Sequence, residues 1–244
     1  YSLRSLMQQI SHLIDGQTVA GKSGNTTAVY NPATGEQTGT LDLASVEEVD
    51  HAVASSKKAF EDWQTVSVAQ RTKLLYNFRN LVEANAEEIA RRLTAEHGKV
   101  NSDAQGEVAR GLENIEFSCG VSEALKGTYT EHASTGVDVY SVRQPLGVCA
   151  GITPFNFPAM VPLWMFPNAV ACGNTFILKP SERDPSAPRF IVELAQEAGF
   201  PPGVVNLING DKVAVDRLLE HSDVKAISFV GSTPIAKYVY ATGA

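Results

Sequence analysis

The sequence predicts an α/β fold: a doubly wound parallel sheet, preceded by helices and interrupted by an inserted β-hairpin. Two changes of hydrophobic period predict it. From residue 147 to the end, short apolar segments alternate with helical segments, which is typical of βαβ units in a parallel sheet. Between residues 45 and 125, apolar residues recur at helical spacing instead. The 244 residues suffice for about one or two domains.

The first segment, residues 13–43, predicts short hairpin strands at the surface. It is rich in Gly, Thr, Asn and Val, and it carries turn signals at Asp15-Gly16, Asn31-Pro32 and Thr34-Gly35.

Three helical stretches follow. A capping box of Ser45 and Glu48 predicts the start of the first, whose apolar stripe consists of Val46, Val49, Val53, Phe60 and Trp63. Ser67 with Gln70 predicts a second capping box, and helix is expected to continue through residues 85–97 to a C-terminal cap at Gly98. Residues 103–125 predict a third long helix despite three internal glycines, one of which is expected where another backbone or a ligand approaches closely.

The spacing of the apolar residues then changes twice. Residues 128–142 alternate around Ser134-Thr135-Gly136, which predicts a hairpin whose exposed edges invite pairing with another segment or chain. After it, strands are expected at 148–152, 175–178, 204–208 and 226–230, with helices at 159–172, 186–198, 213–219 and from 234 onward. Because ligands of doubly wound sheets bind beyond the carboxyl ends of the strands, the residues after each strand are the candidate site.

Composition excludes several functional classes. The 20 Lys and Arg against 27 Asp and Glu give a net charge of −7 without a basic cluster, so no nucleic-acid partner is expected. The most apolar stretch, residues 158–171, is interrupted by prolines and is shorter than the roughly 20 residues of a spanning helix, so no membrane association is expected. Three cysteines argue against a disulfide framework and for a reducing compartment, the cytoplasm. No secretory leader is expected, and Met7 is a candidate natural start.

Asn156 stands in the first of three candidate loops, between two prolines that restrict its directions. Its amide could donate to a developing oxyanion, although the spacing alone favours an Asx turn. In the second loop, Lys179 and Glu182 end a buried strand; they could bind ribose hydroxyls and phosphate, or form a solvated turn in which Ser181 or Asp184 caps the next helix. In the third loop, Gly231 and Ser232 precede a helix whose N-terminus could bind a phosphate group. The alternative is that Ser232 serves only as the N-cap of that helix.

Other familiar sites are missing from the sequence. It has no Gly-x-Gly-x-x-Gly fingerprint and no Walker loop, and its five His are scattered, so no metal site is expected. Cys149 and Cys172 fall in apolar segments and are expected to be buried and inert, while Cys119 lies on the third helix. None has the surroundings of an activated nucleophile.

The three loops in this order and spacing, Pro-Phe-Asn-Phe-Pro, Lys-Pro-Ser-Glu and Phe-Val-Gly-Ser-Thr, resemble the aldehyde dehydrogenase superfamily over almost the whole chain. Within it, the chain is most similar to the CoA-acylating methylmalonate-semialdehyde dehydrogenases, on residues 31–35, 110–117 and 231–236. The resemblance implies a Rossmann-like NAD-binding domain with residues 7–126 as its N-terminal part, 127–145 as an oligomerisation hairpin and 146–244 as its Rossmann-like part. The catalytic domain of that family, with its cysteine, would follow residue 244.

The resemblance also implies a reaction. It is the NAD-dependent oxidation of malonate or methylmalonate semialdehyde to acetyl- or propionyl-CoA, with loss of carbon dioxide and coenzyme A as acyl acceptor. The enzyme would be a homo-oligomer, a dimer or a tetramer, in the cytoplasm, or in the mitochondrial matrix of a eukaryote. The chain alone would be inactive. Two alternatives remain: a non-catalytic dinucleotide-binding module, and an aldehyde dehydrogenase of another subfamily that uses water.

By the same resemblance, Asn156 is the catalytic oxyanion donor, and Arg110 binds the substrate carboxylate. For Arg110 the competing interpretation is an intrahelical ion pair with Glu107 or Glu113. The implied cofactor-binding residues are Thr153, Phe155, Lys179, Glu182, Arg183 and Ser232. Glu182 would repel a 2′-phosphate and so favour NAD over NADP, while the neighbouring Arg183 would soften that preference.

Overall fold

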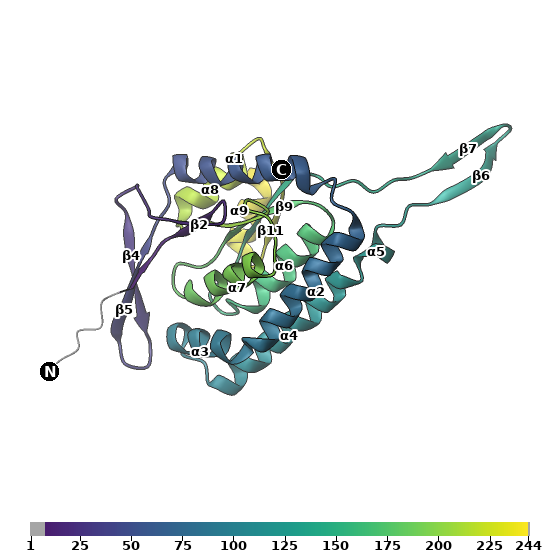
Figure 1. Cartoon of the computed structure of the whole chain (residues 1–244). Helices are drawn as coiled ribbons and strands as arrows, with labels where there is room; N and C mark the ends of the chain where they lie inside the picture. The colour runs from purple at the N-terminus through teal and green to yellow at the C-terminus, as the bar shows by residue number, and fades with distance from the viewer. Residues whose placement is uncertain (1–7, 244) are drawn as a thin grey trace.

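The computed structural model describes residues 8–243, so the candidate start at Met7 lies outside the described residues. Its centre is a six-stranded sheet in the order β11-β8-β9-β10-β2-β3. Helices surround this sheet (Figure 1). β8 (Val148–Ile152), β9 (Thr175–Lys179), β10 (Val205–Leu207) and β11 (Val224–Phe229) run parallel. The doubly wound α/β fold is therefore confirmed.

The N-terminal strands differ from the prediction. β2 (His12–Ile14) is fully buried and pairs antiparallel with β10, and β3 (Gln17–Val19) extends the same sheet. Leu13 and Ile14 point into two different hydrophobic clusters, one on each face, which holds this strand in the core rather than at the surface. β1 (Gln8–Ile10), β5 (Glu36–Asp42) and β4 (Thr26–Asn31) form a separate three-stranded sheet.

The helices before the hairpin follow the capping signals with three corrections. Ser45 and Glu48 form the reciprocal capping box of α1 (Val46–Trp63). Ser67 caps α2 (Val68–Ala84) through the Gln70 amide, but the Gln70 side chain contacts the Ser67 hydroxyl instead of its amide. Asn85 separates α2 from α3 (Ala86–His97). The predicted third helix ends at Gly120, which divides α4 (Asn101–Cys119) from the short α5 (Val121–Ala124).

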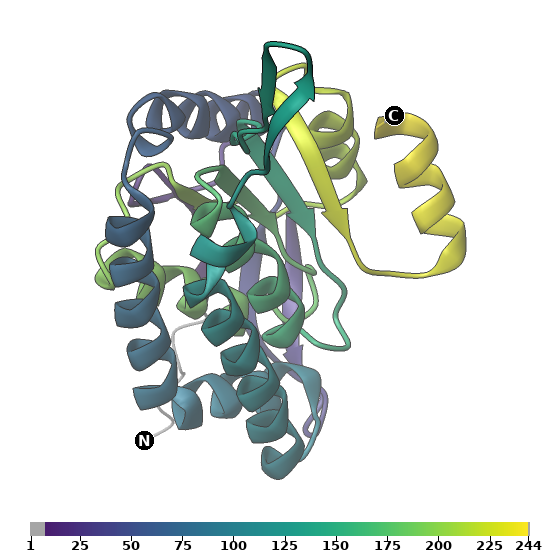
Figure 2. The same ribbon diagram turned by 90° about the vertical axis from the view of Figure 1, so that its right-hand side faces the viewer.

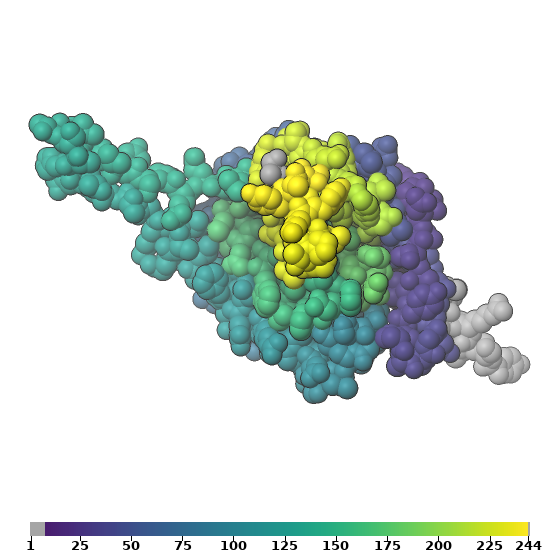
Figure 3. Space-filling view, turned by 180° about the vertical axis from the view of Figure 1, so that it is seen from behind, coloured from purple at the N-terminus to yellow at the C-terminus, as the bar shows by residue number. Residues whose placement is uncertain are grey.

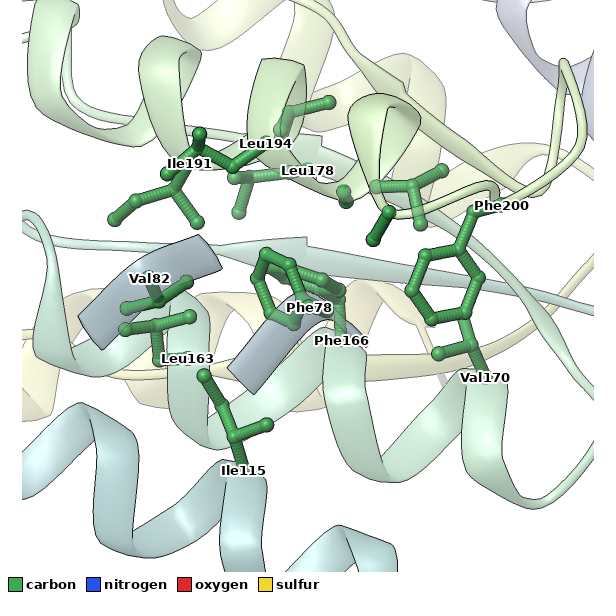
Figure 4. Packing of buried hydrophobic residues seen from close by; sticks show 14 of the residues in the cluster. Phe78, Val82, Ile115, Leu163, Phe166, Val170, Leu178, Ile191, Leu194 and Phe200 are labelled. Carbon is green, nitrogen blue, oxygen red and sulfur yellow. The ribbon is translucent and has the colours of Figure 1, made fainter. Parts of the chain in front are cut away.

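Helices cover both faces of the sheet. α6 (Met160–Ala171) and α7 (Ser186–Glu197) pack with α2 and α4 on one face, while α1 and α8 (Lys212–Glu220) cover the other. Phe78, Phe166 and Phe200 meet between the helices, with 5.4 Å between the ring centroids of Phe78 and Phe166 (Figure 4). α9 (Thr233–Gly243) lies beyond the edge strand β11 (Figure 2).

The inserted hairpin consists of β6 (Tyr129–Ser134) and β7 (Val137–Tyr140). It projects from the body of the molecule as an arm (Figures 1 and 3). All of its strand residues are exposed, including the large side chains of Tyr129, Val139 and Tyr140. An apolar surface held away from the core in this way is available for another chain.

Candidate functional site

The three candidate loops follow the carboxyl ends of β8, β9 and β11, which lie side by side in the sheet. Ile152 at the end of β8 pairs with Lys179 at the end of β9 and with Phe229 at the end of β11. The Thr153 amide donates to the Lys179 carbonyl at 3.1 Å, and the Val230 amide donates to the Ile152 carbonyl at 3.3 Å. Parallel pairing thus aligns three segments that are far apart in the chain.

Lys179 is the buried centre of the second loop. Its Nζ lies 3.6 Å from Oε2 of Glu182, whose side chain is 43% exposed. Burial lowers the pKa of Lys179, and the Glu182 carboxylate opposes that shift. The charged groups therefore do not form a solvated turn: a buried ammonium faces a half-exposed carboxylate that retains acceptor capacity for hydroxyl groups.

Aromatic and polar side chains flank this pair. The Arg183 guanidinium lies over the Phe155 ring, 4.7 Å from its centroid, and the hydroxyl of the buried Thr153 has no hydrogen-bond partner among residues 8–243. Glu182 and Arg183 line a cavity of about 390 Å³ with Tyr30, Pro32 and Glu96, among others. Ser181 accepts from the Arg183 amide, and the amide of Ser186, the first residue of α7, donates to Glu96 at 2.9 Å, so neither Ser181 nor Asp184 has the predicted capping role.

Ser232 lies apart from these residues. It is exposed immediately before α9, and its carbonyl accepts from the Ala236 amide at 2.9 Å. β8 separates its strand from β9 in the sheet order, so a ligand contacting both Glu182 and Ser232 must extend across two strand spacings. A Cβ on Gly231 would approach Cζ of the Phe229 ring to 2.4 Å, so packing against this ring favours glycine irrespective of any ligand.

Asn156 and Arg110 line one cleft. Its volume is about 520 Å³, and its other lining residues are His97, Lys99, Ser102, Asp103, Gly106, Glu107 and Phe157. Both side chains are exposed. Within residues 8–243 the Asn156 amide makes no hydrogen bond, so the Asx turn is not formed, and Arg110 makes no ion pair. An amide and a guanidinium, both free of protein partners in the described chain, therefore face one space.

The competing interpretation of Arg110, an intrahelical ion pair with Glu107 or Glu113, is not observed among residues 8–243, and Glu107 has other partners. Its carboxylate accepts from Lys99 Nζ at 2.6 Å and from the amides of Ala159 and Met160 at 2.8 and 3.0 Å. Sequence reasoning missed both Lys99 and Glu107, since nothing in their spacing distinguishes them from surface charges. It anticipated Gly111 in part: a Cβ there would meet Leu163 Cδ1 at 2.4 Å, so α4 and α6 can pack closely only with glycine.

Asp184 is a buried carboxyl next to this region. It is 2% exposed, and its Oδ1 has no partner among residues 8–243. Burial raises the pKa of Asp184 to about 8, with further contributions from Glu96 and Glu107. The folded chain therefore holds a proton here that an unfolded chain, with an aspartate pKa of about 3.9, releases. The contribution of Asp184 to the free energy of unfolding is therefore complete at and below the pKa of the unfolded chain, and it is lost as the pH rises toward about 8.

The variant Asp184→Asn tests this pH dependence. Asparagine is neutral at every pH, so the melting temperature of the variant should fall less than that of the unchanged chain between about pH 5 and about pH 8. Thermal unfolding followed by circular dichroism measures the difference, with Asp62→Asn on the exposed surface as a control. Parallel curves for the variant and the unchanged chain would contradict the assignment.

The three cysteines are unsuited to nucleophilic attack at neutral pH. Burial raises the pKa of Cys149 to about 11 and also raises the pKa of Cys119 and Cys172. Cys149 is buried as expected, and Cys119 is buried as well. Cys172 at the end of α6, also expected to be buried, is only half-buried. In the described part of the chain no cluster of His, Cys, Asp and Glu could hold a metal ion. The same residues include no helix that is long and apolar enough to cross a membrane.

Comparison with known proteins gives a consistent result. A family model described as the aldehyde dehydrogenase family matches residues 18–244. A malonate-semialdehyde dehydrogenase of Pseudomonas aeruginosa is 52% identical over 97% of this chain and 48% of its own length. A Dictyostelium discoideum protein, named a probable mitochondrial methylmalonate-semialdehyde/malonate-semialdehyde dehydrogenase (acylating), is 48% identical over 99% of this chain and 46% of its own.

Solved structures agree in fold. A Sinorhizobium meliloti protein, assigned as a methylmalonate-semialdehyde dehydrogenase and crystallised with NAD, superposes with a TM-score of 0.96 at 52% identity, over 98% of this chain and 49% of that one. A methylmalonate-semialdehyde dehydrogenase of Oceanimonas doudoroffii gives 0.95 at 52% identity, over 97% and 48%. The chain thus spans about half the length of the relatives it matches.

Proposed function

The chain belongs to the aldehyde dehydrogenase family, and we propose that it is the NAD-binding part of a CoA-acylating malonate- or methylmalonate-semialdehyde dehydrogenase. The reaction converts the semialdehyde to acetyl- or propionyl-CoA with loss of carbon dioxide. The names of the relatives support the substrate class, and the word acylating in the name of the Dictyostelium relative supports an acyl transfer, for which coenzyme A is the proposed acceptor.

One observation carries this proposal: the free Asn156 amide and the free Arg110 guanidinium face the same cleft. A semialdehyde of this class has a carboxylate at one end and a carbonyl at the other. A guanidinium binds a carboxylate through two parallel hydrogen bonds. A side-chain amide stabilises the oxyanion that forms when a nucleophile adds to the carbonyl. The two groups therefore match the two ends of one small substrate.

The residues present also fit NAD. The half-exposed Glu182 carboxylate can accept both hydroxyls of a ribose, and the unpaired Thr153 hydroxyl and the Phe155 ring lie along the neighbouring loop. Lys179 and Ser232 supply further polar contacts at the strand ends. When bound, NAD accepts the hydride of the aldehyde. The chain's own residues orient the cofactor and, by the negative charge of Glu182, disfavour a 2′-phosphate.

The exposed β6–β7 arm supports a homo-oligomer, a dimer or a tetramer, in which the arm of one copy pairs with another copy. The cytoplasm is the proposed compartment. In a eukaryote it would be the mitochondrial matrix, because one relative is named as mitochondrial.

These proposals can be tested in a chimeric enzyme. Residues 1–244 are joined to the half of the Pseudomonas aeruginosa relative that the chain does not match. The chimera places this chain in a complete enzyme and leaves every residue discussed here available for substitution.

Glu182→Gln tests the cofactor assignment. Hydrogen bonds to a charged group contribute about 1.5–3 kcal/mol, so kcat/KM for NAD should fall about tenfold or more. The loss for NADP should be smaller, because the repulsion of its 2′-phosphate is relieved as well. Steady-state kinetics with both cofactors measure the ratio, and Glu197→Gln at the exposed end of α7 is the control. An unchanged NAD/NADP preference would show that Glu182 does not bind the ribose.

A further inference from the structure

A buried ion pair, Lys99 with Glu107, forms part of the wall of the cleft. Lys99 follows the left-handed Gly98 between α3 and α4, and Glu107 lies on α4. Lys99 Nζ and Glu107 Oε2 are 2.6 Å apart, and their side chains are 12% and 1% exposed. Removing two charges from water is costly, so such a pair persists only where further hydrogen bonds satisfy both partners.

Glu107 satisfies the start of a helix to which it does not belong. Its Oε1 accepts from the amides of Ala159 and Met160, the N-cap and first residue of α6. No side chain of the helix itself caps α6. A carboxylate at a helix N-terminus is favoured both by the free amides and by the helix dipole. Glu107 therefore caps α6 from α4.

Lys99 contacts the loop that precedes α6. Its Nζ donates to the main-chain carbonyl of Asn156 at 3.0 Å and lies 4.6 Å from the centroid of the Phe157 ring. The backbone of Asn156 and the start of α6 are thus both fixed to one ion pair. Between them lie only Phe157 and Pro158, so the loop segment between the two anchors has little freedom.

We propose that Lys99 and Glu107 are positioning residues for the reaction: the pair fixes the Asn156 backbone so that its side-chain amide faces the cleft. Arg110 lies one helical turn after Glu107 on α4. The pair consequently also sets the separation between the amide and the guanidinium. This inference rests on the proposed function of Asn156 and Arg110.

The first test measures the hydrogen bonds at the start of α6 in the 244-residue chain itself. In Glu107→Gln, a neutral amide oxygen replaces the carboxylate as the acceptor. Charge-assisted hydrogen bonds are about twice as strong as neutral ones, so the bonds to α6 should weaken. Hydrogen exchange at the amides of Ala159 and Met160 should accelerate by about tenfold. The control is Glu116→Gln on the same helix, where the carboxylate pairs with Arg79 at the exposed surface. Unchanged exchange in Glu107→Gln would overturn the capping role, whether or not any enzyme is active.

The second test separates positioning from mere stabilisation in the chimera. Misplacing a reacting group by about 1 Å can cost about 10²-fold in rate, so Lys99→Met should lower kcat by about tenfold or more at nearly unchanged KM for NAD. Lys99→Arg, which can still donate to both partners, should retain most of the turnover.

In a background of Asn156→Ala, Lys99→Met should have little further effect, because the group that it positions is gone. Equal losses in both backgrounds would overturn the inference. If Asn156→Ala itself left turnover intact, the proposed function would fail instead, and the exchange result would still decide whether Glu107 holds α6.

Discussion

Asn156→Ala should lower the turnover of the chimeric enzyme by about 10²–10³-fold, the usual consequence of removing one oxyanion donor. The Asn156 side chain has no hydrogen-bond partner within residues 8–243, so its loss breaks no hydrogen bond of the folded chain. NAD affinity should therefore remain nearly intact. Steady-state turnover and a calorimetric titration with NAD measure the two effects separately.

The matched control is Asn80→Ala, an exposed asparagine on α2 away from the cleft. A variant Asn156→Ala with the turnover of the unchanged chimera would remove Asn156 from the mechanism. A parallel loss of turnover and of NAD affinity would assign it to cofactor binding instead.

Arg110→Ala should impair the carboxylated substrate far more than an uncharged aldehyde. Charge-assisted hydrogen bonds contribute about 1.5–3 kcal/mol, which corresponds to a loss of roughly 10- to 150-fold in kcat/KM for malonate semialdehyde. Propanal has no carboxylate for the guanidinium to bind, so its kcat/KM should change little. Arg110→Lys should restore only part of the loss, because an ammonium lacks the planar fork.

Arg91→Ala is the control, since Arg91 is exposed and pairs with Glu88 on α3. Equal losses with both aldehydes would mean that Arg110 supports the fold or the cleft in general rather than the substrate carboxylate.

The order of strands and helices could be predicted from the sequence because it depends on local periods. The buried strands β8 and β9 and the capping box of α1 fall where their apolar runs and cap residues place them. β2 could not be placed in this way. It has only three residues, and its burial depends on pairing with β10, almost two hundred residues later in the chain. No local pattern carries that information.

In the candidate site too, features set by nearby residues could be predicted and features set by distant residues could not. Lys179 and Glu182 could be predicted to lie close together because only two residues separate them at the end of a strand. Whether Arg110 is free or paired could not be predicted, since it depends on Glu107 being occupied by Lys99 and by amides of α6 about fifty residues away. Long-range contacts of this kind determine which charged side chains remain available for a ligand.

The central claim is that this chain supplies cofactor and substrate contacts but not the nucleophile. Hydride transfer from an aldehyde requires a tetrahedral adduct, which in the proposed reaction a cysteine thiolate forms. Because burial raises the pKa of all three cysteines present, none is expected to act as that thiolate.

The most direct measurement is NADH formation with malonate semialdehyde, NAD and coenzyme A, by the 244-residue chain and by the chimera in parallel. The chain alone should give no turnover, and the chimera should give turnover that depends on coenzyme A. Turnover by the chain alone that Cys119→Ser abolishes would contradict the account and identify Cys119 as the nucleophile.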